Sequence, residues 1–83
     1  MTKQGLWMLT VSLAQELAPF GVRVNMVSPG YLDIAVDLPS ANQLPMQRPG
    51  YSFEVARVIS FLIDPKSQYI TGQNVEVSGG FSL

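Results

Sequence analysis

The stretch VRVNMVSPGYL, residues 22–32, decides the fold of this 83-residue chain. Its first half is rich in valine and other apolar residues, a composition typical of a strand that is covered on both faces in a parallel sheet. Asn25 interrupts the apolar run, and Pro29-Gly30 ends it with a pair of residues that commonly breaks a strand. We therefore predict a buried strand over residues 22–27, followed by a tight break and an aromatic residue.

The segments on either side of this stretch predict a helix before it, and a loop, a helix and a strand after it. Residues 2–18 favour a helix that Pro19 ends. Residues 29–50 carry four prolines and two glycines, which indicates a long loop. The helical period resumes over residues 53–63, and an alternating pattern predicts a short strand near residues 74–77.

The two predicted strands and the helix between them form a β-α-β crossover, which is expected to be right-handed with parallel strands. A chain of 83 residues allows at most one small domain with a marginal core. A two-stranded parallel sheet also leaves the outer edge of each strand unpaired. We therefore expect residues 1–83 to form a single, incomplete α/β domain.

The composition narrows the classes of function and partner. The chain is 47% hydrophobic and 13% charged, so we expect something outside it to cover part of its surface. The net charge of −1 is spread without runs, which predicts neither a nucleic-acid nor a membrane partner. The absence of Cys and His argues against disulfides, thiolate chemistry and a metal site. No apolar run or N-terminal signal pattern points to a membrane or to export, so a cytoplasmic protein is expected.

Six short motifs in a fixed order carry a resemblance to a known family. They are Arg23-Val24-Asn25, Pro29-Gly30, Glu54-Val55-Ala56, Phe61-Leu62, Ile70-Thr71-Gly72 and Val77-x-Gly79-Gly80. With them, nearly the whole chain resembles the C-terminal part of the short-chain dehydrogenase/reductase family, especially its 3-oxoacyl-carrier-protein-reductase-like members. The resemblance implies a Rossmann-like, doubly wound parallel sheet that binds NAD or NADP at the carboxyl ends of its strands.

The resemblance assigns cofactor contacts to the residues that follow the first strand. In the family, the segment matching Pro29-Gly30 faces the nicotinamide, and the backbone matching Tyr31 and Leu32 meets the carboxamide. Ile34 stands where the family usually has Thr and has no hydroxyl to offer the cofactor. From the residues alone, Pro29-Gly30 is better explained as the end of a strand.

Lys3 is the candidate catalytic residue. It lies between two apolar stripes near the start of the first predicted helix, where the helix dipole opposes a cation, although a lysine at a frayed end shows the same pattern. In the family, this helix opens with Tyr-x-x-x-Lys, whose lysine holds the nicotinamide ribose and lowers the pKa of the tyrosine. Lys3 matches that lysine. The tyrosine would lie two places before Met1. No segment of the chain matches the family's glycine-rich phosphate turn. Neither Ser12 nor Ser28 matches the context of the family's catalytic serine.

Two further features have open interpretations. Arg23 and Glu54 are candidates for an ion pair across the sheet edge, whereas Glu54 also suits the start of a helix. Residues 35–46 resemble the family's substrate lid, and a loop of this composition is equally often disordered.

The first predicted helix indicates self-association. Its two apolar stripes exceed what one sheet face can cover. We expect a dimer or larger oligomer through residues 2–18 and the free edge of the strand at residues 22–27. One stripe contains Leu6, Leu9, Leu13 and Leu17, and the intersubunit candidates that the resemblance suggests are Trp7, Met8, Val11 and Ala14.

Two functions stay open. The first is a C-terminal fragment of an NAD(P)-dependent oxidoreductase of carbonyl and alcohol groups, produced by truncation, proteolysis or a misplaced start codon and inactive alone. The second is a non-catalytic self-association module or the remnant of a gene.

Overall fold

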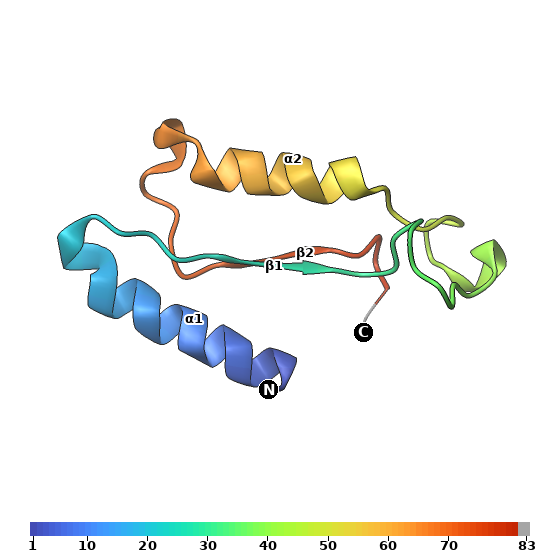
Figure 1. Cartoon of the computed structure of the whole chain (residues 1–83), viewed down its shortest axis with the longest axis horizontal. Coiled ribbons are helices and arrows are strands. Elements are labelled where there is room, and N and C mark those ends of the chain that lie inside the picture. Colours follow the sequence, from blue (N-terminus) through green and yellow to red (C-terminus); the bar gives the residue numbers. More distant parts are fainter. Residues whose placement is uncertain (82–83) are drawn as a thin grey trace.

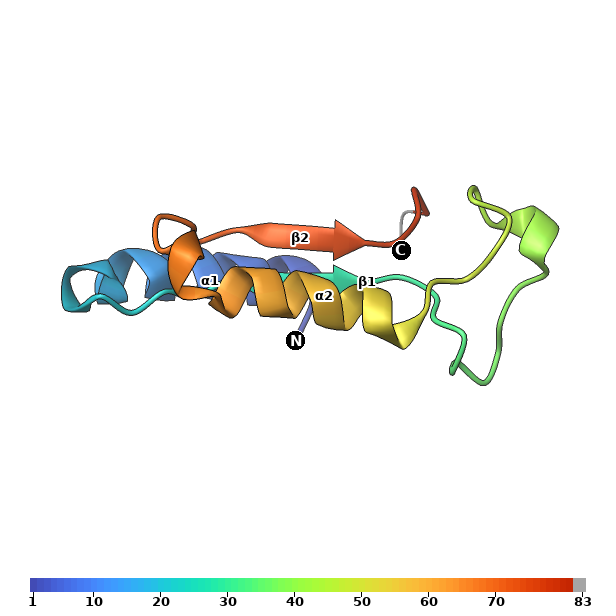
Figure 2. The same cartoon turned by 90° about the horizontal axis from the view of Figure 1, so that it is seen from above.

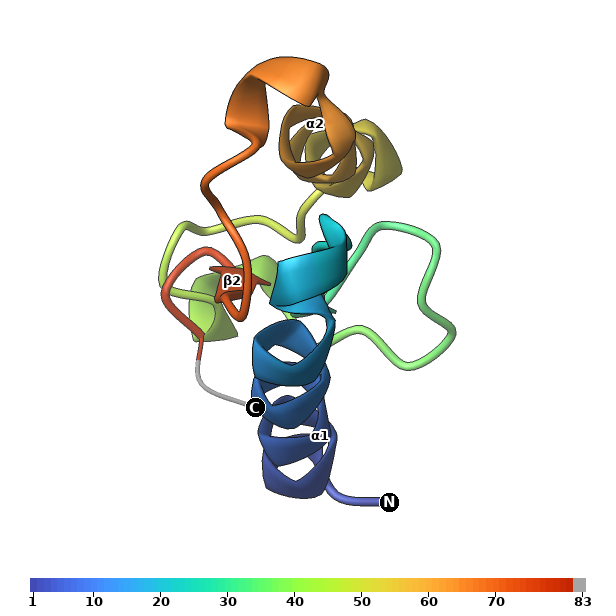
Figure 3. The ribbon, with the colours of Figure 1, turned by 90° about the vertical axis from the view of Figure 1, so that its left-hand side faces the viewer.

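Two helices lie on opposite faces of a two-stranded sheet in the computed structural model, which describes residues 1–81 (Figures 1 and 3). The helices and strands are α1 (Lys3–Leu17), β1 (Met26–Pro29), α2 (Ser52–Ile63) and β2 (Asn74–Val77), with short 3-10 turns at Ala18–Phe20, Ala41–Gln43 and Pro65–Ser67. The order helix, strand, loop, helix, strand confirms the predicted α/β class. No helix among the described residues is long and apolar enough to cross a membrane.

The sheet confirms the predicted parallel crossover. β1 pairs with β2 in register from Met26 opposite Asn74 to Pro29 opposite Val77. The loop between β1 and α2 projects beyond the carboxyl end of the sheet, as Figure 2 shows. The carboxyl ends of both strands therefore lie on the side of the sheet from which this loop projects.

The predicted bounds of the first strand are wrong, because the ladder begins at Met26 and not at Val22. The residues just before β1 form hydrogen bonds with the turn that precedes β2, and most of these bonds involve a side chain. Val24 N–H donates to Thr71 Oγ1 at 3.0 Å, and Gly72 N–H donates to Val24 O at 2.8 Å. This stretch is therefore held beside the second segment without extending the regular ladder.

The helix bounds agree with the predicted ones to within one residue. Thr2 caps α1, since its Oγ1 accepts a hydrogen bond from Gly5 N–H at 2.9 Å. Beyond α1 the chain turns at Gly21, whose φ of 74° favours a residue without a Cβ. A glycine at this place lets the chain reverse from α1 toward the sheet.

The apolar core is small and includes only Ala14, Leu44 and Leu62 among the buried side chains of residues 1–81. The expectation that Ala14 lies on an external face is wrong, because its side chain is 2% exposed and packs near Gly72. The large apolar side chains of α1 that remain exposed are Leu6, Trp7, Met8, Leu9 and Leu13.

The accessible surface is larger than a closed domain of this mass would have. It measures 6096 Å², whereas the scaling for folded monomers gives about 4900 Å² for 9.1 kDa. The radius of gyration is 14.6 Å, against about 12 Å expected for a compact chain of this length. The two helices and the sheet thus leave apolar surface that they do not cover for one another.

Candidate functional site

The carboxyl end of the sheet gathers the residues to which the sequence assigns a site. Lys3, in the first turn of α1, reaches β2 with its Nζ 2.6 Å from Glu76 Oε1. Glu76 lies opposite Ser28, the residue just before Pro29-Gly30. The fold therefore brings Lys3 to the edge at which β1 ends, although the two segments come from different elements.

Gly30 owes its lack of a side chain to packing within the chain. Its N–H donates to Val77 O at 3.0 Å and so continues the pairing with β2. A Cβ on Gly30 would lie 2.8 Å from Ser78 Cβ and 2.9 Å from Ser78 Cα, closer than carbon atoms approach. The residue after β2, Ser78, is thus already packed against Gly30, the residue that the resemblance places against the nicotinamide.

The structure separates the residues after Gly30 into two groups. The Tyr31 ring packs edge-on against Phe81 with 5.2 Å between centroids, and Leu32 pairs with Gly50 in an isolated parallel bridge. Both therefore stay near the edge of the sheet. Ile34 is 75% exposed in the loop, so its side chain is not held at that edge.

An open hollow of about 670 Å³ surrounds Lys3. Its lining is largely polar and comes from the start of α1 and from β2: Thr2, Lys3, Gln4, Trp7, Asn74 and Glu76. The side chains of Lys3 and Glu76 are 40% and 46% exposed, and exposed ion pairs contribute only about 0 to 1 kcal/mol. The ammonium group can therefore exchange this carboxylate for another acceptor at little cost.

These residues fit the ribose end of a nicotinamide nucleotide. An ammonium group offers three donors, which suits the hydroxyls of a sugar. The hollow extends along β2 from Asn74 to Glu76, and open α/β sheets bind their ligands beyond the carboxyl ends of such strands. Among the described residues, Lys3 is thus a hydrogen-bond donor that could hold such a ligand beside β2.

The two serines have structural surroundings, as the sequence indicates. Ser28 is buried in β1 and its Oγ donates to Asn74 Oδ1 at 2.7 Å across the sheet. Ser12 lies on the exposed side of α1. Neither serine lines the Lys3 hollow, although Asn74, the partner of Ser28, does.

The predicted Arg23–Glu54 pair is wrong, because each residue has a different partner. Glu54 pairs with Arg48 in the loop, with Nη1 to Oε1 at 2.8 Å and Nη2 to Oε2 at 3.1 Å. The hydrogen bonds from Arg48 and then from Tyr51 N–H lower the pKa of Glu54 to about 2. An acidic residue in the first turn of a helix predicts the hydrogen bond from Tyr51 N–H to Glu54. Arg48 was not predicted from the sequence as the partner of Glu54.

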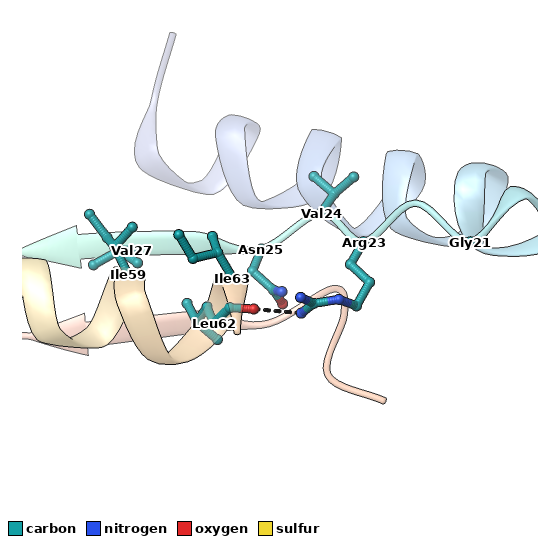
Figure 4. A pocket seen from close by; sticks show the side chains of 8 residues that line it. All are labelled: Gly21, Arg23, Val24, Asn25, Val27, Ile59, Leu62 and Ile63. Atoms are coloured by element: carbon teal, nitrogen blue, oxygen red, sulfur yellow. Dashed lines mark hydrogen bonds between the residues drawn. The ribbon is translucent and has the colours of Figure 1, made fainter. Parts of the chain in front are cut away.

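Arg23 instead fastens the end of α2 to the segment before β2. Its Nη1 donates to Leu62 O at 2.6 Å and to Ile70 O at 3.2 Å, and Asn25 Nδ2 donates to the same Ile70 carbonyl at 3.0 Å. Figure 4 shows the guanidinium directed at the Leu62 carbonyl. Arg23 and Asn25 are therefore polar because each side chain donates hydrogen bonds to carbonyl groups of other segments of the chain.

A second open hollow, of about 660 Å³, lies beside Arg23, between β1 and α2 (Figure 4). Its apolar part comes from Val27, Ile59, Leu62 and Ile63. Among the described residues, β1 has no strand on the edge away from β2. The hollow and the unpaired edge are thus neighbouring parts of one uncovered surface.

Comparisons with known proteins give close similarity over the whole chain. Residues 1–82 match the family model described as enoyl-(acyl carrier protein) reductase. The 3-oxoacyl-[acyl-carrier-protein] reductase FabG of Staphylococcus aureus is 39% identical, with 99% of this chain and 37% of the relative covered. Pteridine reductase 1 of Leishmania tarentolae is 43% identical, with 100% of this chain and 31% of the relative covered.

The solved structures agree with these relatives. The crystal structure of acetoin dehydrogenase from Enterobacter cloacae superimposes with a TM-score of 0.85 at 39% identity. The match covers 95% of this chain and 32% of that one. The chain therefore spans about a third of the length of the proteins it matches.

Proposed function

This chain belongs to the short-chain dehydrogenase/reductase family, and we propose that it supplies the C-terminal part of an NAD(P)-dependent oxidoreductase of carbonyl and alcohol groups. The observation that carries the proposal is the common location of Lys3 and Pro29-Gly30 at the carboxyl end of the sheet. A nicotinamide bound there would supply or accept the hydride. The cytoplasmic location expected from the sequence is part of the same proposal.

In this function Lys3 binds and orients. Its ammonium group leaves Glu76 and donates to the ribose hydroxyls, and its positive charge lowers the pKa of a nearby proton donor. The backbone of Pro29-Gly30, Tyr31 and Leu32 orients the nicotinamide end, whereas Ile34, exposed in the loop, would have to move to reach it. What supports these roles is the exposed ion pair, which is cheap to break, and the end of β1 that lies one residue beyond the partner of Glu76.

We propose that the 83 residues are inactive alone, whether the cofactor is NAD or NADP. Neither the family's glycine-rich phosphate turn nor a tyrosine four residues before Lys3 is among them. The loss of a general acid alone commonly slows a reaction by about 10² to 10⁴.

A chimera tests the proposed enzyme function. This chain replaces the matching third of the Enterobacter cloacae acetoin dehydrogenase, to which it is 39% identical. We expect the chimera to oxidise acetoin, and Lys3→Ala to lower kcat at least tenfold, or about 1.4 kcal/mol in barrier. Gln15→Ala, at an exposed position of α1 outside the hollow, serves as the control and should change kcat less than about threefold.

Two results would contradict this function. A folded chimera without activity would mean that these residues do not support the chemistry. A Lys3→Ala chimera whose kcat stays within about threefold, under 1 kcal/mol in barrier, would remove Lys3 from the site.

The second candidate function, self-association, is favoured by the uncovered surface. The excess of about 1200 Å² over a closed domain exceeds the roughly 800 Å² that each partner buries in a standard interface. We propose a homo-oligomer through residues 2–18 and the free edge of the first strand, which the structure places at Met26–Pro29 and not at residues 22–27. Its face on α1 is the exposed stripe of Leu6, Leu9 and Leu13 with Trp7 and Met8.

A further inference from the structure

The backbone that follows β1 is held by a short paired base of the loop. Leu32 and Gly50 form a parallel bridge. Gly50 N–H donates to Tyr31 O at 2.9 Å, and Asp33 N–H donates to Gly50 O at 2.8 Å. We call residues 31–33 and Gly50 the neck of the loop. The neck fixes the direction in which the chain leaves the sheet.

Arg48 ties the neck to the first turn of α2. Its guanidinium donates two parallel hydrogen bonds to Glu54, at 2.8 and 3.1 Å, and Nη1 also donates to Pro49 O at 2.9 Å. The guanidinium lies 5.1 Å from the centroid of the Tyr51 ring. A planar guanidinium that meets a carboxylate at two points fixes orientation as well as distance. Arg48 therefore constrains the residues on both sides of Gly50.

Glu54 is in turn fixed at the start of the helix. Its Oε1 accepts a hydrogen bond from Tyr51 N–H at 2.9 Å. A Cβ on Gly50 would lie 3.3 Å from Leu32 Cδ2 and 3.9 Å from Glu54 Oε1. Gly50 thus lies between the bridge and the Glu54 carboxylate, with little room on that side for a larger residue. Because the pKa of Glu54 is lowered to about 2, its carboxylate is charged at neutral pH.

We propose that Arg48 is a positioning residue for Tyr31 and Leu32. It acts through Glu54 and Gly50 and does not touch the cofactor. By holding Gly50, it keeps the backbone of residues 31–33 in place where it leaves the carboxyl end of β1. The effect of Arg48 on cofactor binding rests on the proposed oxidoreductase function. Its effect on the position of residues 31–33 is a property of the 83-residue chain itself.

Amide hydrogen exchange of the 83-residue chain measures the positioning directly. The reporters are the N–H groups of Gly50 and Asp33, which donate across the neck, and the internal reference is the N–H of Gly30, which donates to β2. We expect Arg48→Ala to speed exchange at the two neck amides at least tenfold and to leave Gly30 within twofold. Arg48→Lys, which keeps the charge without the two-point contact, should give an intermediate rate.

Two further variants separate the neck from general stability. Glu54→Gln removes the charge that Arg48 binds but keeps a side-chain oxygen for Tyr51 N–H, so it should act on the neck as Arg48→Ala does. Lys66→Ala removes an exposed cation beyond the far end of α2 and is the control, with no change expected at any reporter. Unchanged neck amides in Arg48→Ala, or equal acceleration at the neck and at Gly30, would overturn the proposal.

The acetoin dehydrogenase chimera then tests the consequence for the site. There we expect Arg48→Ala to raise the KM for the dinucleotide at least tenfold with less than a threefold change in kcat, and Arg48→Lys to recover part of the loss. An inactive chimera would contradict the proposed function and leave the exchange result to decide the role of Arg48. An active chimera with an unchanged KM would show that the neck does not position the cofactor-facing segment and would overturn the proposal.

Discussion

Gly30 lies against Ser78 so closely that a Cβ on Gly30 would be 2.8 Å from Ser78 Cβ. We therefore predict that Gly30→Ala lowers the free energy of unfolding by about 1 to 3 kcal/mol, the usual cost of overpacking. Urea denaturation followed by circular dichroism measures the change.

The partner residue supplies the control for this contact. In a Ser78→Gly background, one of the two short contacts disappears and the one with Ser78 Cα, at 2.9 Å, remains. The same Gly30→Ala change should then cost less, but not nothing. Equal stability of Gly30→Ala and the unaltered chain would show that the end of β2 yields easily, and Gly30 would again need a ligand to explain it.

Arg23 provides a test of the contacts between elements. Arg23→Met keeps most of the side-chain length but removes the donors to Leu62 O and Ile70 O. Ile70 O keeps its bond from Asn25, but Leu62 O loses the arginine donor. Loss of a donor to a part-buried carbonyl costs about 1 to 3 kcal/mol, so we predict a loss of that size in the free energy of unfolding. Arg57→Met, on the exposed side of α2, should change it by less than about 0.5 kcal/mol. Similar losses in both variants would contradict the role of Arg23.

The parallel pairing of the two strands could be predicted from the sequence, but the start of β1 could not. A long connection that contains a helix requires parallel strands if they are neighbours, and the structure has this arrangement. An apolar, β-branched run only predicts an extended chain. Whether residues 22–25 join the ladder depends on Thr71 and Gly72, which lie far along the sequence and take the bonds of Val24.

The nearness of Lys3 to the strand pair that precedes Pro29 was predictable, whereas the hydrogen bonds of the neighbouring residues were not, and a cofactor site there stays a prediction. The motifs predicted that Lys3 and Pro29-Gly30 belong to one edge, which the geometry of a parallel sheet requires. The partner of Glu54 could not be read from the same pattern. A carboxylate at the start of a helix suits the helix dipole with any arginine nearby, and only the path of the loop selects Arg48 over Arg23.

The low pKa of Glu54 predicts the pH range over which the Arg48 pair is present. The folded-state pKa, about 2, lies below the ordinary value of 4.5, so the carboxylate contributes stability above pH 4.5. This contribution is lost as the pH falls from 4.5 toward 2. We predict that Glu54→Gln is less stable than the unaltered chain at pH 6 and that the difference shrinks toward pH 2. A difference that is constant over this range would contradict the assignment, and the Glu54 carboxyl shift in NMR reports the titration directly.

Dinucleotide binding by the chain itself is predicted to be weak. The residues that fit the ribose are at one edge, while the glycine-rich turn that seats the phosphates in this family is not among the 83 residues. Titration calorimetry with NADH and with NADPH should give dissociation constants above about 1 mM, which corresponds to only some 4 kcal/mol. Micromolar binding of either nucleotide would contradict this prediction.

Self-association is the prediction that depends most directly on the exposed surface. The stripe of Leu6, Leu9 and Leu13 is 36–43% exposed on α1, and patches of this kind in small proteins mark contact sites. We expect the chain to sediment as a dimer or larger oligomer at micromolar concentration. Leu9→Glu should shift it toward monomer, because a charge would then lie within the apolar contact. Asn42→Glu adds the same charge in the exposed loop, away from α1 and β1, and is the control.

The free edge of β1 gives an independent readout of the same assembly. Because Met26 and Gly30 direct their N–H groups toward β2, the alternation along a strand turns the Val27 N–H toward the unpaired edge. A strand from a second copy would satisfy that donor, so hydrogen exchange at Val27 should slow as the protein concentration rises, while Gly30 should change little. A monomer at all concentrations, with cooperative unfolding and fast exchange at Val27, would mean that the 83 residues cover their own core. This result would contradict the proposed contacts through α1 and through the free edge of β1.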